Sequence, residues 1–592
     1  MIHRSFQRAF ALIALSALGL ALGACGQGNE GVGPARTGPL PPGPSGPAHP
    51  DVAAVVAKVL DDAHHPRLRW PDIPDVATAL ETLYGEEEDR LFWFAGDDAY
   101  PALVDAITAL GDASAHGLDP ADYDAGRLAL VWARVEAGEV LSPAERALFD
   151  LALSVGVTRL VSAAHAGLVD PATLHWGYDV TPKDLDLVET LREIRGGEAV
   201  GTVVADLEPS FAHYDRGREA LGRYRSLAAA GEPEPVPSFD AGQTKVEPGD
   251  AWPAVPLLAA RLAAFGDLSA DHAAADFGSA PGAPPLYDGP LVEAVERFQW
   301  RHGLEKDGVV GRNTLAALNV SLADRARQIE LALERERWLP TMQRRPTVFV
   351  NVALFRLWAT DPTSGDESVR MNVVVGKSLH HHTPIFIEEM RYVVFRPYWN
   401  VPYSIAVRES VPRAREDPSY IEKHDFEIVA SGSETAAAWP PTPENLDKVE
   451  AGKLRIRQKP GPHNSLGLAK FIFPNADNIY MHGTPAQQLF SRARRDFSHG
   501  CIRIEDPMGL AEWVLRDQPE WTRERIDAAM QGERPTRVNL TQPLRVVLFY
   551  VTTHVDSEGV VHFAEDIYGL DQTLDSALRN GYPYPKSARG ES

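Results

Sequence analysis

The pattern of apolar residues changes near residue 346, and this change does most to limit the folds open to the chain. Before it, apolar residues recur at helical spacing, most clearly over 104–110, 144–160 and 185–194. After it, short runs rich in β-branched and aromatic residues stand at 348–352, 371–375 and 392–395, as in strands. A length of 592 residues also exceeds the size of one core, since single domains usually hold about 100–200 residues. We therefore predict a multidomain α+β protein with a helical front and a β-rich rear.

Shifts in composition predict the order of the parts. In sequence they are a lipoprotein-type signal peptide at 1–25, a Gly- and Pro-rich linker at 26–50, a helical scaffold domain at 51–250, a second helical module at 251–320, a β-rich domain at 345–520 and a C-terminal extension at 521–592 that completes the scaffold. Polar and Pro-rich stretches from about 404 to 477 predict an insertion that forms a cap. Near the end, 545–553 and 560–564 are expected to pair as a hairpin.

The first residues indicate export. Arg4 and Arg8 precede an apolar run at 9–22, which is too short to span a membrane comfortably. The run ends in Leu-Gly-Ala-Cys at 22–25, which resembles a lipobox with Cys25 as the lipidated residue. The alternative is an ordinary signal peptide. We expect a periplasmic protein whose only contact with a membrane is a lipid anchor at Cys25.

The net charge and the number of cysteines limit the classes of function that the chain can have. A formal net charge of −24 argues against a nucleic-acid partner, because phosphate binding requires a surplus of Lys and Arg. The chain has two cysteines, so a lipidated Cys25 leaves Cys501 without a partner for an internal disulfide. A free cysteine is commonly a small buried hydrophobe, but the neighbours of this one favour chemistry.

His482, His499 and Cys501 lie within twenty positions of one another. An imidazole can take the proton of a thiol and leave a reactive thiolate, which needs no cofactor. Gly500 lets backbone N–H groups approach a reacting carbonyl, as an oxyanion hole requires. Arg503 could bind a carboxylate or stabilise the turn.

Three other interpretations compete. A zinc site of His482, His499 and Cys501 would lack a fourth protein ligand from another cysteine. Cys501 could be inert and buried, or it could belong to a papain-type peptidase, although the local papain signature is absent. The run at 380–382 is three adjacent histidines, which scatter too widely to chelate a metal and fit a solvated turn better.

Two segments resemble known families. The string from Leu291 to Leu318, with Gly303, Gly308 and Gly311, is similar to the three-helix peptidoglycan-binding module. His482, fifteen intervening residues, Ser498-His499-Gly500-Cys501 and then Arg503 resemble the signature of YkuD-type L,D-transpeptidases. Further matches occur at 375–377, 383–386, 398–402, 458–467 and 470–471, and together they resemble the large subgroup that carries a cap subdomain.

The resemblance implies a mechanism and a set of site residues. Cys501 would attack the carbonyl before D-Ala of a peptidoglycan stem, with His482 as the base, oriented by the carbonyl of Gly483. His499 would line the pocket and, with the N–H groups of Gly500 and Cys501, support the oxyanion. The substrate site would be formed by Arg503, Tyr480, Ser498, Trp399, Asn400, Asn464 and Gly467. For Trp399 and Gly467, packing within a strand or turn is an equal alternative.

Peptidoglycan stem peptides are the expected partners, and a 3→3 cross-link in cell-wall biogenesis is the expected product. A carboxypeptidase that hydrolyses the same thioester, and a ligase that attaches a lipoprotein to the wall, are alternatives on the same site. A wall-binding scaffold without catalysis is a more distant one. The resemblance also implies covalent inhibition by carbapenems.

Overall fold

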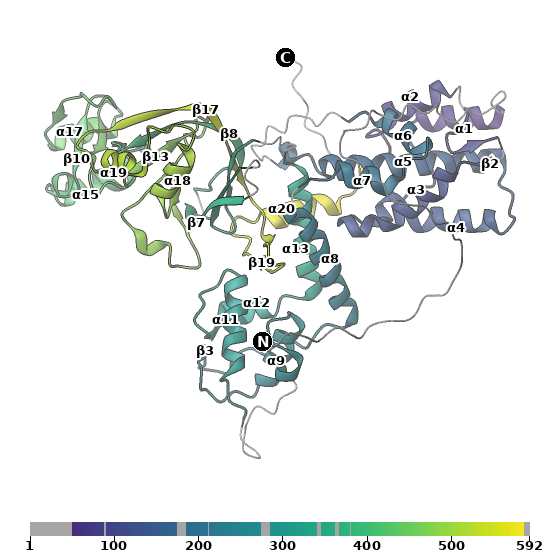
Figure 1. The fold of residues 1–592 in the computed structure, drawn as a ribbon, viewed down its shortest axis with the longest axis horizontal. Helices are drawn as coiled ribbons and strands as arrows, with labels where there is room; N and C mark the ends of the chain where they lie inside the picture. Colours follow the sequence, from purple (N-terminus) through teal and green to yellow (C-terminus); the bar gives the residue numbers. More distant parts are fainter. Residues whose placement is uncertain are drawn as a thin grey trace, which may run out of the picture. The chain divides into compact units, whose positions relative to one another are not determined.

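The computed structural model describes residues 50–584, apart from gaps at 88–89, 97, 175–184, 211, 274–283, 340–344, 362–365 and 379–380 (Figure 1). The predicted signal peptide with Cys25, almost all of the linker and His380 lie outside the described residues.

The helical region after the linker has one hydrophobic core. Its helices are α1 (Pro50–Asp61), α2 (Ala77–Glu86), α3 (Pro101–Gly111), α4 (Ala125–Glu136), α5 (Pro143–Ala166), α6 (Leu187–Arg195) and α7 (Val200–Leu207). The Ser142 side chain accepts the backbone N–H of Glu145, and the Glu145 side chain accepts the backbone N–H of Ser142. This capping box satisfies N–H groups that have no partner within the first turn of α5. By length and composition α5 could cross a membrane, yet most of it is buried inside this core. The three helices that the spacing predicts here are confirmed.

The second helical module is flanked in the sequence by two long helices that pack against each other. These are α8 (Ala212–Ala230) and α13 (Leu322–Arg337), and between them lie α9 (Val255–Ala264), α10 (Ala270–Ala273), α11 (Pro290–Arg301) and α12 (Arg312–Leu318). Gly303 and Gly308 both have positive φ, at the end of α11 and in the turn that follows. The N–H groups of Asp307 and Gly308 donate to the side chain of Gln299, which fixes that turn.

The β-rich region is one large sheet. Its strands are β5 (Thr347–Asn351), β6 (Arg356–Asp361), β7 (Asp366–Gly376), β8 (Phe386–Phe395), β13 (Ala469–Ile472), β14 (Met481–His482), β15 (Asp496–Ser498), β16 (Ile502–Ile504) and β17 (Thr536–Phe549). Their order is β15-β7-β16-β14-β13-β8-β17-β5-β6, and β6 also pairs with β7, so the pairings form a closed circuit. Helices α18 (Pro507–Val514) and α19 (Arg523–Gln531) contact its strands. The predicted fold class is confirmed.

The inserted cap has its own sheet and its own core. Strands β9 (Trp399–Asn400), β10 (Phe426–Val429), β11 (Ala438–Trp439) and β12 (Arg455–Gln458) are ordered β11-β10-β12-β9. Around them lie α14 (Tyr403–Ile405), the π-helical turn η4 (Ala406–Ser410), α15 (Val411–Glu416), α16 (Tyr420–Lys423) and α17 (Pro443–Glu450). The predicted end of the cap at 477 is wrong, because β13 lies within that range and pairs with β8 and β14 of the main sheet.

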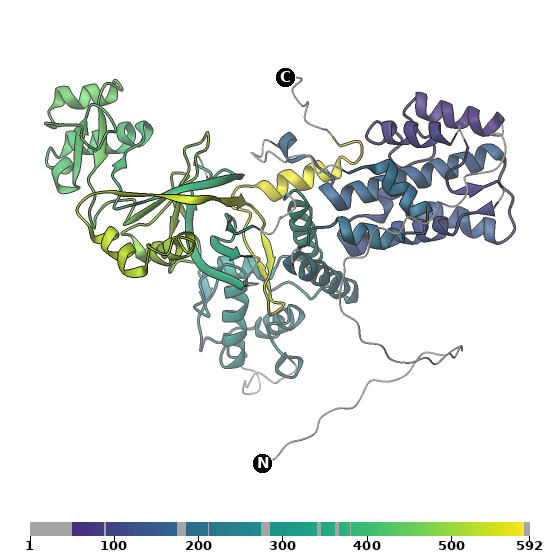
Figure 2. The same cartoon turned by 45° about the horizontal axis from the view of Figure 1, so that its top comes forward.

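The prediction that the C-terminal extension at 521–592 completes the scaffold needs correction, because part of this extension belongs to the main sheet. Strand β17 is a long strand of the main sheet (Figure 2), and it pairs with β8 on one side and β5 on the other. Val546, Val547 and Leu548 are fully buried, as in a strand covered on both faces. The predicted hairpin is therefore shorter than expected, with strands β18 (Thr553–Val555) and β19 (Val561–Phe563). The last helix, α20 (Leu570–Arg579), contacts α13.

Candidate active site around Cys501

The strand register places the candidate residues on one face of the sheet. Lys470 of β13 is opposite His482 of β14, and His482 is opposite Arg503 of β16. Paired residues point to the same face, and side chains alternate along a strand. The neighbouring row, Phe471, Met481 and Ile502, is fully buried in the core, so the Lys470 row occupies the other face. By the same alternation Tyr480 and Cys501 also belong to this face.

The Cys501 thiol, which is partly buried, lies among groups that favour its charged form. Both the N–H and the hydroxyl of Tyr480 bond to it, and Lys470 and Arg503 supply positive charge. Burial nevertheless raises the pKa of Cys501 above its usual value. The resting thiol is therefore protonated at neutral pH, and a base must take its proton.

His482 is suited to that role. Its Nδ1 lies 2.5 Å from the carbonyl oxygen of Gly483, the contact that the family resemblance implies. A carbonyl only accepts, so Nδ1 carries the proton and Nε2 keeps its lone pair. Burial, and then the charge of Arg503, lower the pKa of His482 to about 3, so the ring is neutral above that pH.

The turn before Cys501 corrects part of the predicted oxyanion hole. Gly500 has a φ of +114°, where other residues are strained. Its N–H donates to Ser498 Oγ at 3.0 Å, and this hydroxyl donates to the carbonyl of Cys501 at 2.6 Å. The Gly500 N–H is therefore engaged, whereas the Cys501 N–H has no acceptor among the described residues. Ser498, only 2% exposed, shapes the turn rather than contacting substrate.

His499 is held by the cap. Its Nε2 lies 2.7 Å from Glu409 Oε1 in η4, and its ring is 4.9 Å from that of His381. This contact places His499 beside the Cys501 turn, and its role in lining a substrate pocket stays a prediction. No sequence signal pointed to Glu409, because it lies 90 residues away in an ordinary polar segment.

The remaining predicted substrate residues divide into two groups. Trp399 reaches the active site, because its side chain bonds to Tyr480, and Asn400 beside it is exposed. Asn464 is a correction: it is 1% exposed, and its amide bonds the backbone of Lys459 and Leu466, so it holds its own loop. Gly467 is also structural. A Cβ there would lie 2.6 Å from the backbone of Gly483, so only glycine allows these two backbone segments to approach each other this closely.

Lys470 was matched as part of a family motif but was not predicted to be a site residue. Its Nζ lies 3.7 Å from the centre of the Tyr480 ring, and its charge acts on Cys501. The available signal was a single lysine between the apolar Ala469 and Phe471 of a strand. Burial lowers the pKa of Lys470 to about 8, so its positive charge is present at pH 7 and is lost as the pH rises above 8.

Removing this charge tests its effect on the nucleophile. In Lys470→Met we expect the pKa of the Cys501 thiol to rise by about one unit, because a nearby cation stabilises the thiolate. The pH dependence of iodoacetamide alkylation measures this pKa. Arg537→Met is the matched control, since Arg537 occupies the same row of the sheet two strands further along, beyond Val394. Equal thiol pKa values in Lys470→Met and the wild type would contradict the assignment.

The cap contact makes a second prediction. We expect Glu409→Ala to lower the kcat/KM for acyl transfer by about tenfold, because His499 loses the group that orients it. The thermal midpoint should change little, since partly exposed ion pairs contribute at most about 1 kcal/mol. Glu416→Ala, an exposed acid elsewhere in the cap, is the control. An unchanged kcat/KM in Glu409→Ala would show that the contact has no catalytic role.

No group of three or more His, Cys, Asp or Glu side chains could hold a metal ion within the part of the chain that the structure describes.

Comparison with known proteins identifies three regions of the chain. The family model of the L,D-transpeptidase catalytic domain matches residues 345–538, that of the scaffold domain matches 78–221, and that of the "Putative peptidoglycan binding domain" matches 253–318. A Haemophilus influenzae protein described as "Putative L,D-transpeptidase" is 30% identical over 233 residues. That match spans 39% of this chain and 46% of the relative, less than half of its length.

Among solved structures, the L,D-transpeptidase from Xylanimonas cellulosilytica is 16% identical, with a TM-score of 0.16, over 53% of this chain and 100% of that one. This likeness is too low to support an argument. The assignment depends on the matched domains and their order along the chain. The chain therefore contains an L,D-transpeptidase catalytic domain of the YkuD type, together with a scaffold domain and a "Putative peptidoglycan binding domain".

Proposed function

We propose that this protein cross-links peptidoglycan stem peptides by acyl transfer through Cys501. The observation that carries the proposal is the single face of the sheet that presents Cys501, His482, Tyr480, Lys470 and Arg503. A nucleophile, a neutral base and two cations on one face are the groups that a cysteine acyltransferase requires.

The first half-reaction forms a thioester. Nε2 of His482 takes the thiol proton, and Sγ attacks the carbonyl that links the third stem residue to D-Ala. The Cys501 N–H and the nearby cations stabilise the oxyanion. The C–N bond then breaks, the proton moves from His482 to the departing amine, and D-Ala leaves. Because Lys470 and Arg503 disfavour an imidazolium, His482 gives up this proton readily.

The second half-reaction resolves the thioester. The amine of a second stem attacks the thioester carbonyl, an amide forms, and Sγ leaves and regains a proton. Diaminopimelate as the attacking residue gives the 3→3 cross-link. Stem peptides carry carboxylates, and the cationic pair Lys470 and Arg503 offers them a binding surface on a protein of strongly negative net charge.

Product analysis separates this function from its alternatives. The purified protein is incubated with a disaccharide-tetrapeptide, and the products are identified by mass spectrometry. A dimer that lacks one D-Ala supports the transpeptidase. A tripeptide alone supports the carboxypeptidase, and transfer only to a lipoprotein peptide with a terminal lysine supports the ligase. Absence of every product would leave the wall-binding scaffold.

Export and anchoring are part of the proposal. We propose a periplasmic protein anchored by lipid at Cys25, which is supported by the apolar run at 9–22 and the four residues that end it. Labelling of the wild type, but not of Cys25→Ala, with a palmitate analogue is the expected result. Covalent inactivation by carbapenems is also proposed, because a strained lactam resembles the acyl donor, and the intact mass of the adduct tests it.

A further inference from the structure

Thr383 lies behind the catalytic turn and bonds to it. The residue is 1% exposed, and its Oγ1 donates to the carbonyl of Gly500 at 2.7 Å. The same Oγ1 accepts the N–H of Gly376 at 2.9 Å. Since the atoms of a peptide unit are coplanar and its C=O and N–H point in opposite directions, fixing the Gly500 carbonyl also fixes the Cys501 N–H.

Tyr568 holds Thr383 from a distant part of the chain. Its hydroxyl accepts the N–H of Thr383 at 3.1 Å and donates to the carbonyl of Gly376 at 2.7 Å, so it joins the two ends of the loop at 376–383. Its ring stacks on His382 with centres 4.0 Å apart. Gly376 and His381 approach closely, because a Cβ on Gly376 would lie 1.8 Å from the carbonyl oxygen of His381.

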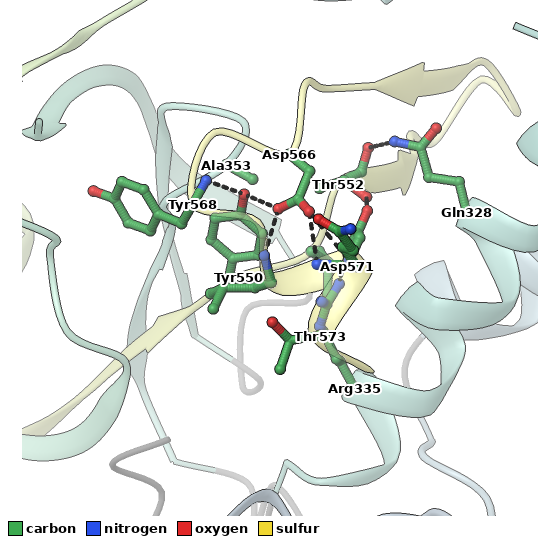
Figure 3. A network of polar contacts seen from close by, with 12 residues as sticks. Gln328, Arg335, Ala353, Tyr550, Thr552, Asp566, Tyr568, Asp571 and Thr573 are labelled. Carbon is green, nitrogen blue, oxygen red and sulfur yellow. Dashed lines mark hydrogen bonds and ion pairs between the residues drawn. The ribbon is translucent and has the colours of Figure 1, made fainter. Parts of the chain in front are cut away.

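Tyr568 is anchored in turn by the polar network in Figure 3. Its N–H donates to the hydroxyl of Tyr550 at 3.2 Å, and that hydroxyl donates to Asp566 at 2.7 Å. Asp566 also accepts the N–H groups of Leu570 and Asp571 at 2.8 Å each, at the start of α20. Asp571 pairs with Arg335 of α13, so the network extends from this helix to the back of the active site.

We propose that Tyr568 is a positioning residue for acyl transfer, which acts through Thr383 to hold the Gly500–Cys501 peptide with the Cys501 N–H directed at the developing oxyanion. This peptide needs such support, because glycine at a φ of +114° has few steric limits on its rotation. The other backbone donor of the turn, the Gly500 N–H, is already bonded to Ser498. This proposal adds a positioning residue to the proposed acyl transfer. It rests on the proposed function only for the identity of the natural substrate.

The test compares two reactions of Cys501 in the full-length protein. Acetylation by p-nitrophenyl acetate passes through an oxyanion: the S–C bond forms, the ester C–O bond breaks, and nitrophenolate and the thiol proton leave. Alkylation by iodoacetamide displaces iodide without an oxyanion. We expect acetylation to fall about tenfold to a hundredfold in Tyr568→Phe and Thr383→Val, with alkylation within about twofold of wild type. Thr383→Ser keeps the hydroxyl and should restore acetylation.

Tyr584→Phe is the matched control, since among the described residues that hydroxyl bonds the Leu578 carbonyl of the same C-terminal segment. The proposal would be overturned if Tyr568→Phe were acetylated at the wild-type rate, or if its acetylation and alkylation fell equally. It would also be overturned if the wild-type protein were acetylated no faster than a free cysteine. The ester needs no stem-binding site. A protein that passes this test but releases no D-Ala from a tetrapeptide would contradict the proposed function and leave the positioning role of Tyr568 intact.

Discussion

Cys501→Ala is expected to abolish D-Ala release from a tetrapeptide stem, with a loss of at least about a thousandfold, because nucleophiles of acyl-transfer enzymes act as a unit with their base. The substitution removes one sulfur atom from a partly buried position, so the fold should persist. A coupled assay for free D-Ala measures the rate, and circular dichroism of the same samples checks the fold.

Cys501→Ser is the matched control for this prediction. It keeps the shape of the side chain but replaces the thiol by a hydroxyl, whose pKa is too high for Lys470 and Arg503 to yield an alkoxide. We expect this variant to be as inactive as Cys501→Ala while it still binds the stem peptide. Full turnover by either variant would show that Cys501 is not the nucleophile.

His482→Ala is expected to have the second largest effect, a fall in D-Ala release of about a hundredfold or more, which is the usual contribution of a positioned general base. Alkylation of Cys501 near neutral pH should slow as well, because no imidazole then takes the thiol proton. His463→Ala is the control, since His463 is 78% exposed and lies in a loop near the cap. An unchanged alkylation rate in His482→Ala would move the base role to His499 or to another group.

The low pKa of His482 predicts how activity depends on pH. Because burial and Arg503 lower the pKa of His482 to about 3, the ring stays neutral from pH 5 to 8 and becomes charged only in strong acid. Activity between pH 5 and 8 should therefore show no step from His482, and its NMR signals should not titrate there. A titration of His482 near pH 6.5 would contradict this description of the base.

The candidate nucleophile and base could be identified from sequence because the whole pattern is local. His482 lies on β14 and Cys501 directly precedes the neighbouring strand β16, and strand alternation then places Arg503 and Tyr480 on the same face. The helices of the scaffold were also predictable, since their apolar spacing persists over several turns.

Other parts of the site could not be predicted, because they depend on contacts between distant segments. The Thr383–Tyr568 bond spans 185 residues and joins a loop to the C-terminal extension. No local pattern specifies which strands pair, so the place of β17 inside the main sheet was missed. The sequence also wrongly predicts that the Gly500 N–H belongs to the oxyanion hole. This N–H is bonded to Ser498, and that bond depends on the φ of the turn, which the residue types do not reveal.

A covalent intermediate at Cys501 is the central step of the proposed mechanism. Its most direct test is the intact mass of the protein after rapid mixing with a disaccharide-tetrapeptide and acid quenching. We expect an adduct equal to the substrate minus D-Ala, absent from Cys501→Ala and slower to form in His482→Ala. D-Ala release that proceeds with no such adduct, or an adduct of the same mass on Cys501→Ala, would contradict the account.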